Sequence, residues 1–139
     1  CLSTLNQAEQ LLSKPVAPPD SGWTSPFDLG ALTSEVARSM CDLRDYTAAA
    51  EFARRTIRLR SPERMRARAL ASLTLSRALL GQGLVEEAAE VTTTVVPAVP
   101  MVGSVVVSSQ LRSVGEGLAA HRAIPMVATA LGEVEDVLA

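Results

Sequence analysis

The chain has 139 residues, of which 47% are hydrophobic and only 3% aromatic, and its formal net charge at pH 7 is -2. This length fits one domain with a continuous core. The nearly balanced charge predicts no bulk attraction to nucleic acid or to an anionic membrane.

The beginning of the chain predicts a helix followed by a loop. Residues 1–13 place five apolar side chains, four of them leucines, at helical spacing. This favours a leading helix, the second of a pair whose first helix is missing, so we expect the chain to be a piece of a longer polypeptide. Residues 14–24 are rich in proline and glycine and indicate a loop, and the predicted repeat domain covers residues 25–139.

A first helical pair follows this loop. Ser25-Pro26-Phe27-Asp28 combines an N-cap residue, a proline at the first helical position and an acidic side chain in the first turn. We expect this helix to run to about Cys41. Its partner opens at Asp45 and Tyr46 and stops near Arg60.

A second pair begins with Ser61-Pro62-Glu63, which repeats the start signal. Its first helix should continue to Gly81-Gln82-Gly83, where glycine permits the left-handed turn that ends a helix. The partner helix is expected from about Val85 to Val96. The Val/Thr run over residues 91–96 favours a strand by itself, whereas its place in the repeat favours a helix, which we predict.

The repeat is visible in the sequence as a pattern that returns after 39 positions. Val36-Ala37-Arg38-Ser39-Met40 returns as Leu75-Ser76-Arg77-Ala78-Leu79, and Ala49-Ala50-Glu51-Phe52 returns as Ala88-Ala89-Glu90-Val91. A period of this size is typical of stacked helical repeats. The sequence therefore predicts an all-α fold, an α-solenoid of about three antiparallel helical pairs preceded by one extra helix.

The third pair is expected from about Val102 to Ala119 and from Pro125 to Leu138. The shift of 39 positions aligns Leu75 with Val114 in this pair. Its register depends on fewer matches than that of the first two pairs.

Two corners between paired helices resemble those of the tetratricopeptide repeat. They are Leu43-Arg44-Asp45-Tyr46-Thr47-Ala48-Ala49 and Leu80-Gly81-Gln82-Gly83-Leu84-Val85-Glu86-Glu87-Ala88, and the resemblance covers about residues 25–138. Arg44 stands where the first corner glycine of the family is expected, and the period is longer than the usual ~34 residues.

The resemblance also implies packing roles for the corner residues. Ala49 and Ala88 would let paired helices approach closely, and the bulky Tyr46 would fill the space between repeats. Two residues depart from the small or aromatic residues usual at their positions, Thr56 and Thr92.

The order of features along the chain is similar to the C-terminal repeat region of actinobacterial helix-turn-helix transcriptional regulators of the XRE type. These features are Trp23 before the first helix, the two corners, the Arg-rich join between them, and the turn His121-Arg122-Ala123-Ile124-Pro125. In that family the DNA-binding module precedes the repeats. The resemblance therefore implies DNA binding only through a region outside this chain.

In tetratricopeptide repeats the first helix of each pair lines a concave groove that binds partner segments. The resemblance places Arg38 and Arg77 at equivalent groove-facing positions, with Ser34, Leu73 and Gln110 nearby. Two such guanidinium groups could clamp a carboxylate or a phosphate, or they could be ordinary solvated arginines. The lysine and asparagine residues of the carboxylate-clamp repeats are absent.

A denser basic cluster lies around the join between the first two pairs. It consists of Arg54, Arg55, Arg58, Arg60, Arg64, Arg66 and Arg68. These residues could form one basic patch for nucleic acid or for an acidic partner, although arginine is favoured at a helix C-terminus by the helix dipole alone. No aromatic residue lies within the cluster to stack on a base.

Features of catalysis or of cofactor binding are missing. His121 is the only histidine, and Cys1 and Cys41 make neither a disulfide framework nor a zinc motif, which is consistent with a reducing cytoplasm. Gly81-Gln82-Gly83 lacks the lysine of a phosphate loop, and no nucleophile elbow occurs. We predict no enzyme activity, no cofactor and no metal site.

The sequence thus predicts a non-catalytic, cytoplasmic module that binds a protein or peptide or oligomerises. It would be the sensor or dimerisation part of a bacterial transcriptional regulator, with a homodimer among its expected states and no membrane association. Two alternatives remain open: a receptor groove for a small signalling peptide or molecule, and a nucleic-acid-binding surface at Arg54–Arg68.

Overall fold

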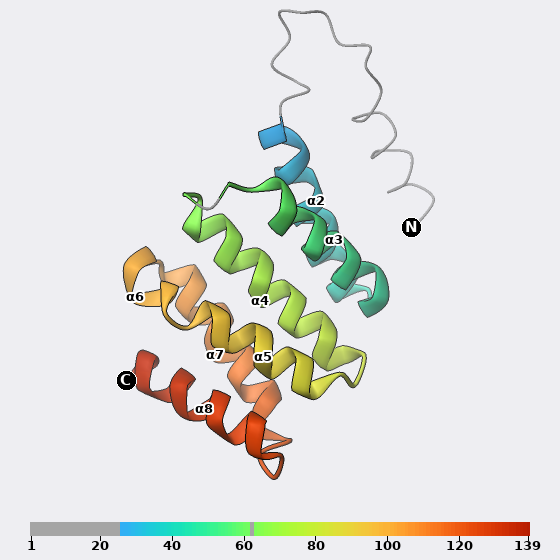
Figure 1. Cartoon of the computed structure of the whole chain (residues 1–139). Coiled ribbons are helices and arrows are strands. Elements are labelled where there is room, and N and C mark those ends of the chain that lie inside the picture. The colour runs from blue at the N-terminus through green and yellow to red at the C-terminus, as the bar shows by residue number, and fades with distance from the viewer. Residues whose placement is uncertain (1–25, 62) are drawn as a thin grey trace, which may run out of the picture.

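The computed structural model describes residues 26–61 and 63–139, which form seven helices and no strand (Figure 1). The predicted all-α class is confirmed. The predicted leading helix at residues 1–13 and the predicted loop at 14–24 lie outside the described residues. No helix in the described ranges is both long and apolar enough to cross a membrane.

Most of the helices form three consecutive hairpins. The first consists of α2 (Pro26–Asp42) and α3 (Tyr46–Leu59), and the second of α4 (Met65–Gly81) and α5 (Val85–Val95). The third consists of α7 (Val105–Ala119) and α8 (Pro125–Leu138), and the short α6 (Ala98–Val102) lies between the second and third hairpins. The expected helix over the Val/Thr run is confirmed, because α5 reaches Val95.

The backbone conformation at the corners of the first two hairpins also repeats after 39 positions. Both corners contain a residue in the left-handed conformation, Arg44 with φ 62° and Gly83 with φ 81°. The amide that follows each of them donates a 2.9 Å hydrogen bond to a carbonyl of the preceding helix, that of Met40 or of Leu79. The two helix ends are therefore built alike, with arginine in place of glycine in the first.

Small residues allow the helices of the first two hairpins to pack closely. Ala49 and Ala88 are both completely buried. The ring of Tyr46, at the start of α3, lies so close to Gly81, at the end of α4, that a Cβ atom added to Gly81 would collide with it. Tyr46 thus fills space between successive hairpins, the role that the resemblance implied.

Two pairs of buried hydroxyl groups connect the helices within these hairpins. Thr56 on α3 donates a 2.8 Å hydrogen bond to the hydroxyl of Thr33 on α2, and Thr92 on α5 donates one of 3.1 Å to Ser76 on α4. Thr56 and Thr92 are the two residues that stand where small or aromatic packing residues are usual in the repeat. Each hydroxyl group forms a hydrogen bond to a side chain on the opposite helix, and this bond offsets the free-energy cost of burying the hydroxyl.

The contacts between hairpins change along the chain (Figure 1). The second helix of the first hairpin, α3, packs against α4, whereas the third hairpin places α7 against α4 and α8 against α5. Little contact joins α5 to α7. The short α6 packs against α4, α5 and α7 and buries Val99 in the core.

Two predicted helix starts are wrong. Helix α4 begins at Met65 after N-cap Arg64, not at Ser61, and the Arg64 amide donates a 3.0 Å hydrogen bond to the Ser61 carbonyl before the helix starts. The third pair begins at Val105 and not at Val102, because Gly103 has a positive φ of 61° and the side chain of Ser104 caps α7.

Candidate functional site

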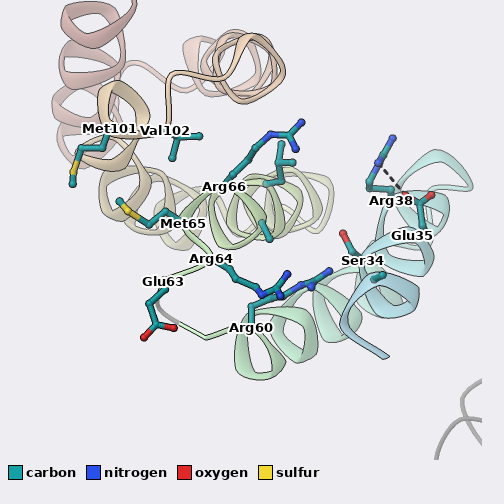
Figure 2. Close-up of a pocket in the computed structure, with 13 residues that line it drawn as sticks. Ser34, Glu35, Arg38, Arg60, Glu63, Arg64, Met65, Arg66, Met101 and Val102 are labelled. Atoms are coloured by element: carbon teal, nitrogen blue, oxygen red, sulfur yellow. Dashed lines mark hydrogen bonds and ion pairs between the residues drawn. The ribbon is translucent and has the colours of Figure 1, made fainter. Parts of the chain in front are cut away.

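A pocket of about 660 Å³ opens where the first hairpin, the turn after α3, the start of α4 and the short α6 meet (Figure 2). Its lining carries four arginines and two glutamates, so the positive charge is in excess. The lining residues are Ala31, Ser34, Glu35, Arg38, Arg60, Glu63, Arg64, Met65, Arg66, Ala67, Leu70, Met101 and Val102.

The four arginines reach the pocket from three parts of the fold. Arg38 comes from α2, Arg66 comes from the first turn of α4, and Arg60 and Arg64 come from the two ends of the turn between α3 and α4. In Figure 2 the side chains of Arg60 and Arg64 point toward α2, whereas the carboxylate of Glu63 points away from them. Partial burial, and then the neighbouring charge of Arg64, lowers the pKa of Arg60 from its ordinary value.

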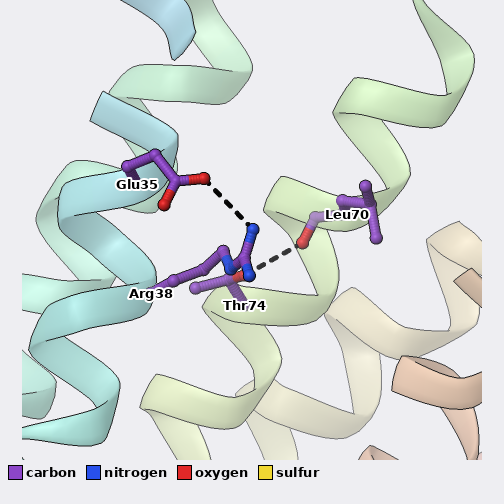
Figure 3. A network of polar contacts seen from close by, with 4 residues as sticks. All are labelled: Glu35, Arg38, Leu70 and Thr74. Atoms are coloured by element: carbon purple, nitrogen blue, oxygen red, sulfur yellow. Dashed lines mark hydrogen bonds and ion pairs between the residues drawn. The ribbon is translucent and has the colours of Figure 1, made fainter. Parts of the chain in front are cut away.

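Local contacts hold two of these arginines in place. A guanidinium nitrogen of Arg38 lies 3.2 Å from the carboxylate of Glu35 one turn earlier on α2, and both side chains are largely exposed. Figure 3 shows this pair facing Leu70 and Thr74 of α4. The Arg66 Nε donates a 3.3 Å hydrogen bond to the Ser104 hydroxyl, which links α4 to the N-cap of α7.

The start of α4 adds positive potential to the same pocket. The first amide groups of a helix have no partner within the helix, and the aligned peptide dipoles place about half a positive charge there. The side chain of the N-cap residue, Arg64, accepts no hydrogen bond from these amide groups. The pocket therefore combines guanidinium groups with an uncapped helix start, an arrangement that favours carboxylate or phosphate groups.

The predicted groove residues are not gathered in one place. Ser34 and Arg38 line the pocket, but Arg77 lies elsewhere on α4 and forms a 3.1 Å ion pair with Asp42. Leu73 is only 1% exposed, so its side chain belongs to the core and a surface partner cannot reach it. Gln110 is exposed on α7 and does not line the pocket. Arg38 and Arg77 each form an ion pair with a carboxylate, that of Glu35 or of Asp42, and all four side chains are largely exposed.

Only part of the predicted basic cluster lines the pocket. Arg60, Arg64 and Arg66 line the pocket. The other four arginines have different surroundings. A guanidinium nitrogen of Arg54 lies 3.7 Å from a carboxylate oxygen of Glu87 on α5, and the Arg55 guanidinium lies 5.9 Å from the centre of the Phe52 ring. Arg58 is exposed on α3, and Arg68 donates hydrogen bonds to the carbonyls of Ile57 and Arg60. Three of the seven predicted residues therefore line the pocket, and the other four do not.

Sequence reasoning missed the side of the pocket that α6 provides. Met101 and Val102 line it together with Met65 and Leu70 of α4. The signal that could have found α6 is the Pro97-x-x-Pro100-x-x-Gly103 spacing, which separates a short segment from the helices on either side.

Two kinds of reactive group can be assessed in the part of the chain that the structure describes, namely metal ligands and the thiol of Cys41. No three His, Cys, Asp or Glu side chains there lie as the ligands of a metal ion would. Cys41 is buried with its thiol 3.9 Å from the Thr74 carbonyl, and burial raises the pKa of that thiol, which disfavours the reactive thiolate. The pocket lining has an excess of positive charge, since four arginines stand against the two carboxylates of Glu35 and Glu63.

Comparison with protein-family models, with curated proteins and with solved structures gives no match to this chain.

Proposed function

We propose that this chain is a non-catalytic binding module whose pocket holds an acidic segment of a partner protein. The observation that carries the proposal is the convergence of Arg38, Arg60, Arg64 and Arg66 on one pocket at the uncapped start of α4. Guanidinium groups bind carboxylates through charge-assisted hydrogen bonds, often two at a time. Because the pocket extends from α2 to α6, an extended segment suits it better than a single ion.

We further propose that the module is the sensor or dimerisation part of a bacterial transcriptional regulator. This role is supported by the resemblance of the two corners and of the order of features to the repeat regions of such regulators. The α-solenoid arrangement and the cytoplasmic location belong to the same proposal. The matching backbone of the first two corners supports the repeat.

The experiment that tests the pocket measures peptide binding by fluorescence anisotropy. The probe is a short fluorescein-labelled peptide of alternating Glu and Ser, compared with the same peptide in which every Glu is replaced by Gln. We expect the acidic peptide to bind at least about tenfold more tightly at low salt, with the difference shrinking as salt screens the charges.

A matched pair of variants separates the pocket from overall charge. Arg38→Gln with Arg64→Gln removes two charges from the pocket and should weaken binding of the acidic peptide about tenfold or more. Arg58→Gln with Arg112→Gln removes two exposed charges outside the pocket, so its affinity should stay within about twofold of the parent. Equal weakening by both variants, at unchanged helicity, would contradict a specific pocket.

A further inference from the structure

Apolar side chains from α4 and α6 line the same pocket as the arginines. Met65 and Val102 are partly buried there, and Met101 is 72% exposed on α6 (Figure 2). In Figure 2 Met65, Met101 and Val102 gather at the end of the pocket away from Arg38. The pocket therefore presents apolar side chains as well as charged ones, and a ligand that spans it meets both.

The position of Met101 is fixed by the anchoring of α6. Val99 is buried in the core, whereas Met101, two positions later on this short helix, is turned out to solvent. An exposed methionine leaves apolar area in contact with water, and its flexible thioether adapts to many apolar partners, which is why methionine is frequent at binding surfaces.

We infer that the ligand is an acidic segment that also carries one bulky apolar side chain, which packs against Met65, Met101 and Val102 while its carboxylates meet the arginines. This inference rests on the proposed function and adds the specificity of the site to it. The occupant is a segment of another protein, because the charge of the pocket complements an acidic chain and the cluster of Met65, Met101 and Val102 complements a single large apolar side chain. The apolar contact would select among acidic segments that the arginines alone would bind alike.

A double comparison tests the apolar contact separately from the charge. Two labelled peptides have the same alternating Glu and Ser sequence, but one carries Leu at its centre in place of Ser. Each is titrated against the parent, against Met101→Ser, and against Met126→Ser, which removes a partly exposed methionine on α8 outside the pocket. For the parent and for Met126→Ser we expect the Leu peptide to bind about tenfold more tightly than the Ser peptide. For Met101→Ser the difference should fall below about threefold.

The outcomes distinguish this inference from the proposed function. If the parent binds both acidic peptides equally well, the charged pocket stands and the apolar contact is overturned. Binding of neither peptide overturns both proposals.

Two other occupants are tested with the same peptides. If Trp23→Ser in the whole chain raises the affinity for the Leu peptide several-fold, the chain's own segment competes for the pocket and the inference fails. A dimer of the parent that the Leu peptide dissociates, seen by sedimentation velocity, would assign the pocket to a second copy and would also overturn the inference.

Discussion

Arg44 and Gly83 take the same backbone conformation at equivalent corners, but only glycine does so without steric cost. Both have a positive φ, 62° and 81°. A residue with a Cβ atom in this region is less stable by about 1 kcal/mol, whereas glycine enters it freely. The corner tolerates Arg44 because the hydrogen bonds that close the helix end are the same as at Gly83.

This difference predicts opposite effects of two substitutions. Arg44→Gly should raise the free energy of unfolding by about 0.5–1 kcal/mol, because it relieves strain at the cost of some flexibility in the unfolded chain. Gly83→Ala should lower it by about 1 kcal/mol, and since nothing lies within 4 Å of the added Cβ atom, the effect reports the backbone alone. Urea unfolding measures both. A loss of stability in Arg44→Gly would contradict the strain at this corner.

At the scale of the helices, Arg68 joins α4 to the end of α3. Its guanidinium donates hydrogen bonds of 2.9 and 2.8 Å to the carbonyls of Ile57 and Arg60. The last carbonyls of a helix have no partner within the helix, so a cation from the next helix satisfies them and complements the helix dipole. Arg68 thereby also fixes the turn from which Arg60 and Arg64 enter the pocket.

Arg68→Ala should therefore lower the free energy of unfolding by about 1–2 kcal/mol, because two carbonyls lose a charged donor. Arg58→Ala is the matched control: it removes an exposed arginine from the same helix end, and we expect a change below about 0.5 kcal/mol. Chemical unfolding of the two variants checks the difference. Equal stabilities would mean that water replaces the Arg68 contacts at no cost.

Helix bounds could be predicted from the sequence where local signals determine them. Pro125 at the first helical position and the apolar spacing after it set α8, and Asp45, whose carboxylate accepts a hydrogen bond from the Ala48 amide, sets the start of α3. The start signal at Ser61 gave the wrong position. Helix α4 starts only at Met65, which is one period of 39 positions after Pro26, the first residue of α2.

The candidate site could be predicted only in part, because it depends on contacts between distant segments. The sequence indicated that Arg38 and the Arg60–Arg66 region could bind anions, but it assigned them to different surfaces. The pocket exists because α2 packs beside the start of α4 and because α6 folds back onto α4. Neither contact leaves a periodic signal in the sequence. The resemblance placed Leu73 in the groove, whereas in the structure its side chain is buried.

At the scale of the whole molecule, the distribution of charge bears on the nucleic-acid alternative. The net charge is -2, and several arginines outside the pocket lie beside carboxylates, as Arg54 does with Glu87 and Arg122 with Glu135. Binding to duplex DNA gains affinity from each phosphate that a cation neutralises, so a nearly balanced surface with dispersed arginines gains little.

We therefore expect the chain to bind duplex DNA with a dissociation constant of about 10 µM or weaker at physiological salt, and equally for unrelated sequences. Selective binding needs side chains that reach base edges from an element lying in a groove, and the pocket arginines converge on a concave site rather than on a protruding helix. Anisotropy titrations with two labelled duplexes of different sequence measure this, and Arg38→Gln with Arg64→Gln should weaken both to the same small extent. Sub-micromolar binding to one duplex only would reinstate Arg54–Arg68 as a nucleic-acid surface, because overall charge cannot distinguish two sequences of equal length.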